Sequence, residues 1–345
     1  MKNTIIERSG EEAYDFISGF VNLDSLNTIV VSTTNEFNIV NNPNKYSAIV
    51  NLSRVNNIRF INKFFEKING KLDNGNFFIG CFETFSARRS KKWINKIPII
   101  RSIYFGIEFI FSRVFPKVWG LKKLYFFFTQ GRNRLLSKAE VLGRLVCCGF
   151  DIVETKSVKG KLYFVTKKKK EPEFNMSPSY SLLFGMNRVG KHGKIIKVYK
   201  FRTMHPYSEY LQQYMIKTNG YDKDGYGKIN NDFRTTSYGK FLRKYWLDEI
   251  PQIINVLKGQ MKIVGIRPLS QTRFDQFPDD FKEERKKHKP GCIPPYVALL
   301  MSSETENIEA ERIYIEEKKK RPYSTDIKYF FLAIYNILSG KIRSA

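Results

Sequence analysis

The sequence contains few cysteines and few histidines, and neither residue type is arranged as a metal centre requires. The four cysteines, at positions 81, 147, 148 and 292, form no CxxC pair and no spacing typical of a disulfide framework. The three histidines, at positions 192, 205 and 288, are scattered along the chain. These patterns argue against a thiolate or zinc site and favour a reducing compartment.

Long hydrophobic runs are also missing. No stretch reaches the ~18 uninterrupted apolar residues that a membrane-spanning helix needs. The nearest runs are residues 103–115, which Glu108 and Arg113 interrupt, and residues 329–338. The first residues lack the basic and then apolar pattern of a secretory signal. We therefore expect a chain that does not cross a bilayer, although it can lie on one.

Acidic residues are outnumbered, since 33 Asp and Glu stand against 59 Lys and Arg and give a net charge of +26. Such an excess attracts polyanions, whether nucleic acid, anionic lipid headgroups or phosphorylated substrates. Aromatic residues make up 15% of the chain, and a basic, aromatic composition suits a membrane interface at least as well as RNA. Nucleic-acid binding would rest on charge alone, so we expect no nucleic-acid partner.

A length of 345 residues allows two domains with separate cores. Residues 167–179 are charged, contain two prolines and lack hydrophobic periodicity, as a linker does. We predict an N-terminal domain at 1–169, a linker at 170–178 and a C-terminal domain at 179–345.

The first half alternates short apolar runs of strand length with segments of helical spacing. The predicted strands are 28–32, 47–52 and 76–82, the predicted helices are 58–68 and 137–148, and a hairpin is predicted at 149–168.

Residues 27–169, with a hairpin predicted to turn at Lys159 and Gly160, resemble the second half of a class I methyltransferase fold. That family binds S-adenosylmethionine on a glycine-rich turn after its first strand, and no GxGxG is present here. The resemblance implies a truncated Rossmann-like α/β domain that does not transfer methyl groups. A generic α/β domain is the alternative.

Residues 98–128 form a basic and aromatic insertion in this half. Its aromatic faces are interrupted by cations such as Arg101, Lys122 and Lys123. One interpretation is a helix pair lying among lipid headgroups, with its cations reaching toward water. The other is a lid that covers the domain's own core.

The stretch from 230 to 269 predicts two helices separated by a break. Thr236 or Ser237 can cap the first helix, which runs to about Trp246 and has an apolar face that includes Phe241.

Asp248 is expected as the N-cap of the second helix, with Glu249 in its first turn. Ile253, Ile254 and Leu257 are expected to bury one side of this helix, and Gly259 to end it. Free backbone amides and the positive dipole at such a helix start favour phosphate binding.

Two adjacent carboxylates surrounded by cations suit a divalent metal together with a diphosphate, because the metal needs oxygen ligands and arginines bind phosphate oxygens. The carboxylates are Asp248 and Glu249, and the surrounding cations are Lys200, Arg202, Arg234, Arg243 and Arg267. Spacing alone therefore predicts a phosphate-handling site.

Two strings, NRVGKHGKIIKVYKFRTM at 187–204 and DFRTTSYGKFLRKYWLDEIPQIINVLKGQMKIVGIRPL at 232–269, closely resemble the signature blocks of the bacterial sugar transferases. These are monotopic polyprenyl-phosphate phosphoglycosyl transferases. The resemblance implies a small α/β catalytic domain that transfers a phosphosugar from a UDP-sugar to polyprenyl (undecaprenyl) phosphate at the start of surface-polysaccharide assembly. It also implies a peripheral or monotopic position on the cytoplasmic face of the inner membrane.

Residue by residue, the resemblance makes Asp248 the nucleophile that forms an aspartyl-phosphosugar intermediate. Glu249 would help to hold Mg²⁺ with Asp248 or handle the acceptor's proton. Lys200, Arg202 and Arg267 would bind the phosphates. A homo-oligomer is compatible with the sequence.

The sequence departs from the family pattern at several points. A charged linker stands where the family has a membrane hairpin, GQM replaces GDM, and GIRP replaces GPRP. PGCIPPYVALLMSS at 290–303 replaces the usual PGITGWAQVNGR and loses an arginine expected near the sugar nucleotide. These changes keep two alternatives open: a catalytically silent, membrane-associated adaptor of a glycan assembly complex, and a methyltransferase acting on glycan precursors. Retention of both acids opposes the first, and the missing glycine-rich turn opposes the second.

Overall fold

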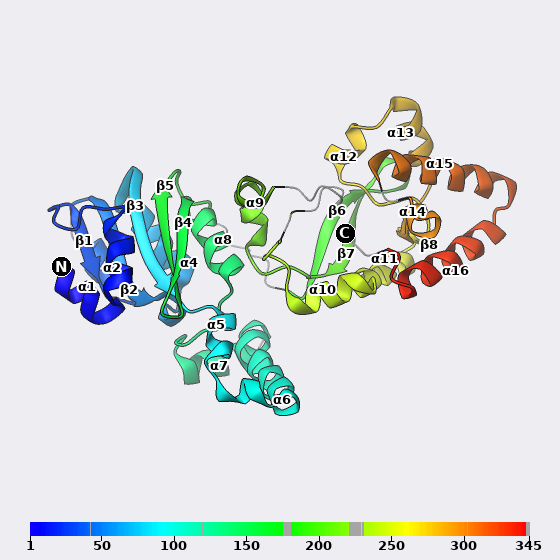
Figure 1. Cartoon of the computed structure of the whole chain (residues 1–345). Helices are drawn as coiled ribbons and strands as arrows, with labels where there is room; N and C mark the ends of the chain where they lie inside the picture. Colours follow the sequence, from blue (N-terminus) through cyan, green and yellow to red (C-terminus); the bar gives the residue numbers. More distant parts are fainter. Residues whose placement is uncertain are drawn as a thin grey trace. The chain divides into compact units, whose positions relative to one another are not determined.

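The computed structural model describes residues 1–342, apart from residues 42, 119, 175–180, 221–228, 230 and 302. The described chain forms two compact units (Figure 1). Unit 1 contains residues 1–180 and 205–215, and unit 2 contains residues 181–204 and 216–345. The mixed α/β fold predicted from the sequence is confirmed.

The predicted linker, 170–178, is only partly described. Residues 175–178 lie outside the described residues. Before them, the Glu173 amide donates to the Cys147 carbonyl over 3.0 Å, so the chain stays attached to unit 1 as far as Glu173.

Residues 205–215 pack on unit 1, which the sequence did not predict. Tyr207 explains the attachment, because only 2% of it is exposed and its hydroxyl accepts a 2.9 Å hydrogen bond from Asn62. The Arg144 guanidinium lies 4.4 Å from the centre of the Tyr207 ring. Arg144 also forms a buried ion pair with Glu140 over 2.9 Å.

Unit 1 is built on a five-stranded sheet with the order β1-β2-β3-β5-β4. The strands are β1 (Thr28–Val31), β2 (Tyr46–Arg54), β3 (Leu72–Phe82), β4 (Phe150–Val158) and β5 (Lys161–Lys168). The first three are parallel, and β5 is antiparallel to both of its neighbours. The β4–β5 hairpin turns at Lys159 (φ 47°) and Gly160 (φ 75°), which confirms the predicted hairpin.

Helices cover both faces of this sheet (Figure 1). They are α1 (Lys2–Ser9), α2 (Glu11–Ser18), α4 (Ile61–Gly70) and α8 (Lys138–Cys147), with the short α3 (Phe37–Val40) and η1 (Val55–Asn57) after the first two strands. Helix α8 begins after Ser137, whose hydroxyl accepts from the Glu140 amide.

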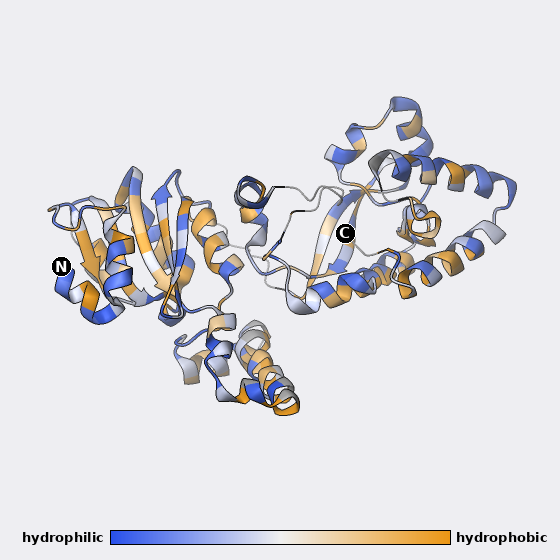
Figure 2. Ribbon diagram, viewed as in Figure 1, coloured by the Kyte–Doolittle hydropathy of each residue, from blue (hydrophilic) through white to orange (hydrophobic). Residues whose placement is uncertain are grey.

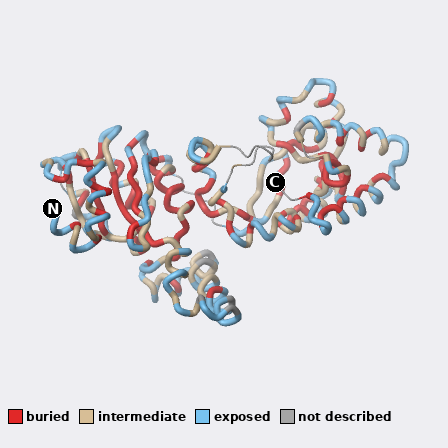
Figure 3. The backbone as a smooth tube through the Cα atoms, viewed as in Figure 1, coloured by how far each residue is buried: buried red, intermediate tan, exposed pale blue. Residues whose placement is uncertain are grey.

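Aromatic rings fill the core between the sheet and α4. Phe65, Phe78 and Phe164 meet one another with ring centres 5.3 to 6.4 Å apart. Gly80 permits this packing, because a Cβ atom at that position would lie 2.6 Å from the Phe164 ring. Figure 3 shows the resulting concentration of buried backbone in the sheet.

The insertion predicted at 98–128 lies within a longer helical arm. The elements of this arm are α5 (Phe85–Ser90) and η2 (Trp93–Lys96), which precede the predicted range, and α6 (Pro98–Phe109), η3 (Ile110–Val114), η4 (Phe115–Lys117) and α7 (Leu121–Thr129). Many apolar side chains of this arm face outward, among them Ile99, Ile103, Ile107 and Phe128. Figures 2 and 3 show the arm as rich in apolar residues yet largely exposed. This exposure favours the interfacial helix pair over a lid on the core.

Unit 2 contains few strands, as predicted. Its strands are β6 (Leu183–Val189) and β7 (Ile195–Phe201), which form an antiparallel hairpin around η5 (Lys191–Gly193), and β8 (Lys262–Val264) with β9 (Gly291–Ile293), which pair in parallel. Its helices are α10 (Ser237–Lys244), η7 (Leu247–Gln252), α11 (Ile253–Leu257), α12 (Gln271–Asp275), α13 (Asp279–Lys286), α14 (Pro295–Leu299), α15 (Glu304–Lys320) and α16 (Ser324–Leu338). Two further elements, η6 (Ser208–Leu211) and α9 (Gln212–Asn219), come between β7 and α10 in the sequence.

The core of unit 2 gathers around Trp246, Phe281, Tyr314 and Tyr329. None of the described helices, in either unit, has the length and apolar character needed to pass through a bilayer.

Two predictions about the helices near Asp248 are wrong. The second helix does not have Asp248 as its N-cap: Trp246 precedes the 3₁₀ turn η7, and Asp248 lies inside its first turn. Its apolar side is largely exposed, because Ile253 is 54% and Leu257 84% exposed, whereas Ile254 is half-buried. The first helix does begin at Thr236, whose hydroxyl accepts from the Gly239 amide, but its Phe241 is exposed as well.

A buried amide takes the place of the expected apolar anchor. Asn255 is 0% exposed and its side chain accepts from the Tyr199 amide over 3.2 Å. It also donates to the Lys197 carbonyl over 2.8 Å and to the Gln260 side chain over 2.9 Å. Hydrogen bonds from Asn255 to β7, together with the packing of Val256 against Ile196 and Val198, therefore hold α11 in position.

Candidate active site

The two predicted acids lie at the start of η7, where the chain reverses direction. Trp246 adopts a left-handed backbone conformation (φ 58°), and its buried ring lies 6.4 Å from that of Tyr296. Asp248 follows with only 3% of its surface exposed. Glu249, whose amide donates to the Trp246 carbonyl over 3.2 Å, has a side chain that is 15% exposed. An anchored turn thus presents adjacent carboxylates from one side of the unit 2 core.

Glu249 joins the two sequence blocks that the motif analysis identified separately. Lys200, on β7, donates to one oxygen of the Glu249 carboxylate and forms an ion pair with it. The Gln252 side chain donates to the other oxygen. The prediction that Lys200 lies beside the acids, 49 residues away in sequence, agrees with this contact.

Arg243 lies near Asp248, the other acid of the pair. Its Nε donates to the Thr203 hydroxyl over 3.0 Å. Burial lowers the pKa of the Arg243 guanidinium, and the negative charges of Asp248 and Asp232 oppose that shift. The guanidinium therefore experiences the Asp248 charge in a partly dehydrated environment.

Arg234 and Asp232 form a two-pronged pair. Arg234 Nε donates to Asp232 Oδ1 over 2.9 Å, and Nη2 donates to Oδ2 over 2.7 Å. Burial disfavours the Asp232 carboxylate, yet the hydrogen bonds from Arg234 outweigh it and lower the pKa of Asp232. Sequence reasoning named Arg234 and missed Asp232, although the DFR string contains both.

Arg202 lies at the open end of the β6–β7 hairpin. Its Nε donates to the Ser181 carbonyl over 3.0 Å, and its guanidinium lies 5.3 Å from the Phe184 ring centre. Only 9% of Arg202 is exposed, so these contacts fix the end of the strand that contains Lys200.

Arg267 is related to the acids through a tyrosine that all three residues influence. Its guanidinium lies 5.3 Å from the centre of the Tyr296 ring. Burial raises the pKa of Tyr296, the positive charge of Arg267 opposes this, and the charges of Glu249 and Asp248 add to it. Both acids and Arg267 therefore act on one buried phenol.

Arg188 is a further cation at this site that the sequence analysis did not single out. Burial lowers the pKa of its guanidinium, the charge of Arg267 lowers it further, and Glu249 opposes the shift. Arg188, Arg267 and Ser270 line a hollow of about 260 Å³. The signal was available, because Arg188 belongs to the NRVG string.

The backbone of Arg267 is held by a buried ion pair. Its amide donates to Glu311 over 2.8 Å, and its carbonyl accepts from Arg285 over 2.6 Å. Arg285 and Glu311 also pair directly. Burial lowers the pKa of Arg285 to about 9, and the nearby charge of Arg267 contributes.

Residues 290–296, in the segment that departs from the family pattern, lie beside the site. Strand β9 of this segment pairs with β8, and the Gly291 amide donates to the Ile266 carbonyl over 2.9 Å. This pairing brings Tyr296 beside Arg267 and Cys292 near Glu249. Burial raises the pKa of the Cys292 thiol to about 12, and the Glu249 charge adds to the effect, so the thiol is un-ionised at neutral pH.

Among the described residues, no group of three or more His, Cys, Asp or Glu side chains could hold a metal ion by itself. Mg²⁺ is commonly bound by one or two carboxylates and completes its shell with substrate phosphates and water. Asp248 and Glu249 provide carboxylates of that kind, and in this structure the two Glu249 oxygens accept hydrogen bonds from Lys200 and Gln252.

This arrangement defines a class of protein. An α/β domain that directs two adjacent carboxylates and several guanidinium and ammonium groups at one location is suited to phosphoryl-group chemistry. Residues 174–340 match the family of bacterial sugar transferases. The C-terminal half of this chain is therefore a bacterial sugar transferase domain.

Relatives of known name support the match. The chain is 31% identical over 158 residues to the galactosyl transferase CpsE of Streptococcus agalactiae, covering 46% of this chain and 35% of the relative. It is 40% identical over 103 residues to the undecaprenyl-phosphate galactose phosphotransferase of Salmonella typhimurium, covering 28% and 21%. It is 34% identical over 160 residues to the UDP-glucose:undecaprenyl-phosphate glucose-1-phosphate transferase of Escherichia coli, covering 45% and 32%.

The chain thus spans about a third or less of the length of these three relatives. The family match begins at residue 174, so the methyltransferase resemblance of residues 27–169 stays a prediction.

Proposed function

We propose that this protein is a phosphoglycosyl transferase that moves a sugar 1-phosphate from a UDP-sugar to undecaprenyl phosphate at the start of polysaccharide assembly. The names of the relatives support this choice of donor and acceptor. The observation that carries the proposal is the Lys200–Glu249 pair next to the buried Asp248, with Arg243 and Arg267 close by.

In this proposal an oxygen of the Asp248 carboxylate attacks the β-phosphorus of the UDP-sugar. The bond between that phosphorus and the oxygen bridging to UMP breaks, UMP leaves with the bonding electrons, and the phosphosugar remains on Asp248 as an acyl phosphate. A phosphate oxygen of the lipid acceptor then attacks the same phosphorus, which releases the Asp248 carboxylate.

The cations divide between holding phosphate and arranging the site. Lys200, Arg202, Arg243 and Arg267 are proposed to neutralise the diphosphate and the departing UMP. The Arg234–Asp232 pair is proposed to hold the segment before α10 in place, and Arg243 is influenced by both Asp248 and Asp232. Glu249 either helps to hold a metal or handles the acceptor's proton.

Mg²⁺ would be held by Asp248 and Glu249, and when bound it would offset the charge that builds up on the leaving UMP.

Membrane association is part of the proposal. The arm formed by α6 and α7 exposes an apolar face, and α16 exposes Ile327, Phe331, Tyr335 and Leu338 along one side. These faces support a peripheral or monotopic position on the cytoplasmic side of the inner membrane, where UDP-sugars are available.

The proposed chemistry is tested by intact-mass measurement of the full chain after incubation with Mg²⁺ and a panel of UDP-sugars. A mass increase equal to one phosphosugar, absent in Asp248→Asn, would identify both the nucleophile and the donor. An increase that persists in Asp248→Asn would rule out Asp248 as the attacking group.

The second candidate is the silent adaptor, and the segment 290–303 favours it. In this segment, Tyr296 lies with its buried ring beside Arg267. The family pattern has an arginine in the same segment, which this chain lacks. Release of UMP by the unaltered chain, abolished by Asp248→Asn, would exclude the adaptor. Membrane binding without UMP release from any donor would support it.

A further inference from the structure

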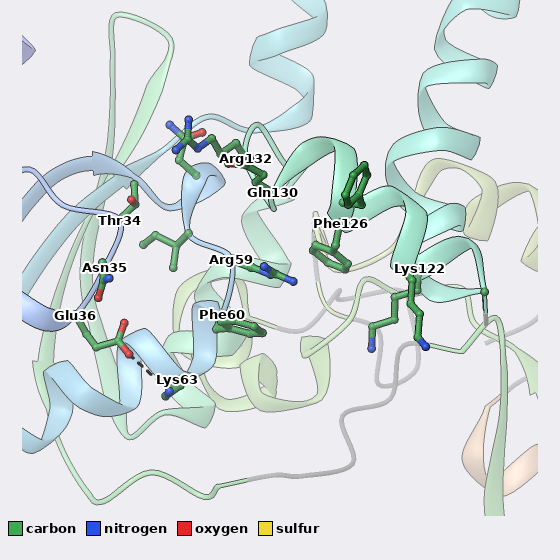
Figure 4. Close-up of a pocket in the computed structure, with 15 residues that line it drawn as sticks. Thr34, Asn35, Glu36, Arg59, Phe60, Lys63, Lys122, Phe126, Gln130 and Arg132 are labelled. Atoms are coloured by element: carbon green, nitrogen blue, oxygen red, sulfur yellow. Dashed lines mark ion pairs between the residues drawn. The ribbon is translucent and has the colours of Figure 1, made fainter.

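Unit 1 contains a hollow of about 1200 Å³ that the proposed transferase chemistry does not use. It lies at the carboxyl ends of the neighbouring parallel strands β1 and β2 (Figure 4). Residues 34–36 follow β1 and residues 57–60 follow β2, and α7 of the helical arm supplies the opposite wall. The carboxyl ends of parallel strands are the usual position of ligands in open α/β sheets.

The lining of this basic hollow is cationic. Its lining cations are Arg59, Lys63, Lys122, Lys123 and Arg132. Glu36 is its lining acid and pairs with Lys63 over 3.8 Å. Within the described part of the chain, the other four cations form no ion pair with a carboxylate. Their charge is therefore available to a ligand.

The arm adds to this charge. Residues 85–136 contain 12 Lys and Arg and a single acid, Glu108, and two of these cations, Arg88 and Lys91, pair with Glu83 just before this range. Glu108 is already paired with Lys92 over 2.6 Å. The field around the hollow is therefore strongly positive and attracts anions from solution or from a membrane surface.

Arg59 is held in the orientation that a phosphate site needs. Its guanidinium lies 5.2 Å from the centre of the Phe60 ring and 5.7 Å from that of Phe126. Figure 4 shows Arg59 extending from the loop after β2 toward α7, with Phe60 and Phe126 on either side. Aromatic faces restrain the guanidinium plane and leave its N–H edge for bidentate contact with phosphate oxygens.

Apolar surface adjoins the cations. Phe60 is 64% and Phe127 77% exposed, and both line the hollow. A site for inorganic phosphate alone would not need exposed rings, whereas an organic phosphate has an apolar part that can cover them.

We infer that the basic hollow is a second ligand site, which binds a phosphate group of an organic molecule through Arg59 and the α7 lysines and the molecule's apolar part through Phe60 and Phe127. The favoured source is a phosphomonoester lipid, because α7 continues from the hollow into the exposed apolar face of the arm. A lipid lying along that face would present its headgroup to Arg59. This inference does not depend on the transferase proposal, since none of its residues belongs to the sugar transferase match.

The test compares binding of the full chain to phosphatidylcholine vesicles that contain either phosphatidic acid, a phosphomonoester, or phosphatidylglycerol, a phosphodiester, at equal surface charge. We expect tighter binding to phosphatidic acid. Arg59→Gln should weaken that binding about tenfold or more, as loss of a charge-assisted bidentate contact does. Lys122→Gln, at an exposed position on α7, should act in the same direction.

The matched control is Lys67→Gln, which removes one charge from an exposed position on α4, one turn beyond Lys63 and outside the hollow. Diffuse attraction to anionic lipid predicts at most about fivefold weakening there. Arg59→Lys keeps the charge and should retain part of the preference for phosphatidic acid.

A second experiment, with a soluble ligand, distinguishes a lipid phosphate from a soluble phosphate compound. Adenosine monophosphate, titrated calorimetrically, should bind more weakly than the vesicles if the ligand is a lipid. Binding of the nucleotide that is tighter than vesicle binding and lost in Arg59→Gln would support the phosphate site and replace the lipid source by a soluble one. Equal weakening by Arg59→Gln and Lys67→Gln, or no binding of either probe, would overturn the inference. UMP release from UDP-sugars, measured in parallel without vesicles, should be the same in all these variants.

Discussion

Replacement of Lys200 by Met tests the contact that joins the two signature strings. Lys200 and Glu249 have side chains that are 21% and 15% exposed, so solvent screens their pairing less than it would on the surface. A hydrogen bond between two charged groups contributes ~1.5–3 kcal/mol, which corresponds to about a 10- to 150-fold change in rate if the contact is needed in the transition state. We expect Lys200→Met to lower UMP release by this factor and Lys200→Arg to recover part of it.

The assay is continuous measurement of UMP release by Lys200→Met, Glu249→Gln and the double variant. Because the two side chains contact each other, the double variant should lose less activity than the product of the two single losses. Lys197→Met, on the same strand but exposed, is the matched control and should stay within about twofold of the unaltered chain. Activity in Lys200→Met equal to that control, or single losses that simply multiply, would refute the idea that the pair belongs to the active site.

Three further predictions concern stability and membrane contact. Asn255→Ala should lower the free energy of unfolding by ~2–4 kcal/mol in urea titrations, because it removes three buried hydrogen bonds and leaves two backbone groups of β7 unpaired; a loss below that of an exposed substitution would contradict this. Phe331→Ser, at a position 66% exposed, should change the unfolding free energy by no more than ~0.5 kcal/mol yet weaken vesicle binding; unchanged vesicle binding would remove α16 from the proposed membrane contact. Hydrogen bonds from Lys287 and Lys319 lower the pKa of Glu284 to about 2 from an ordinary value of 4.5, so its stabilising contribution is present above about pH 4.5 and is lost as the pH falls toward 2. Glu284→Gln should therefore destabilise the protein at neutral pH and match the unaltered chain near pH 2, as measured by urea unfolding across that range.

Hydrophobic spacing was sufficient to predict the strands of unit 1 and its helices α4 and α8, but it did not predict α1 and α2. The strands of unit 1 are apolar runs bounded by turn residues, and its hairpin turn uses Lys159 and Gly160, which tolerate the positive φ angles required. Local signals of this kind are contained within a few residues. The attachment of residues 205–215 was not predictable in that way, because Tyr207 finds its partners, Asn62 and Arg144, far away in the sequence.

The same difference explains the errors near Asp248. Helical spacing correctly grouped Ile253 and Leu257 on one face, and the usual inference is that such a face is buried. Here a polar side chain, Asn255, anchors the helix, and the apolar face stays exposed. Helical spacing shows that two residues share a face. It does not show whether that face is covered by the protein's own core or by something outside the protein, such as a lipid.

The motifs predicted that Lys200, Arg243 and Arg267 lie near the acids. They did not point to Arg188, Asp232 or Tyr296. Two of the missed residues contact predicted site residues, and the third, Arg188, lines a hollow with Arg267. Asp232 fixes Arg234, and Tyr296 lies under Arg267. A motif identifies groups that would touch a substrate, whereas supporting contacts depend on the three-dimensional packing of segments such as 290–303.

The unusual segment 290–303 is compatible with an active site for a physical reason. Its backbone still pairs β9 with β8 and so keeps the turn that contains Arg267 in place. The Arg285–Glu311 pair, which lies outside this segment, fixes the Arg267 amide and carbonyl independently of it. Phosphate binding by Arg267 therefore does not require the family's usual sequence at 290–303. What the substitution changes is the surface beside that cation, where a buried tyrosine ring now lies, and the sugar of the donor is the group most directly affected by such a change.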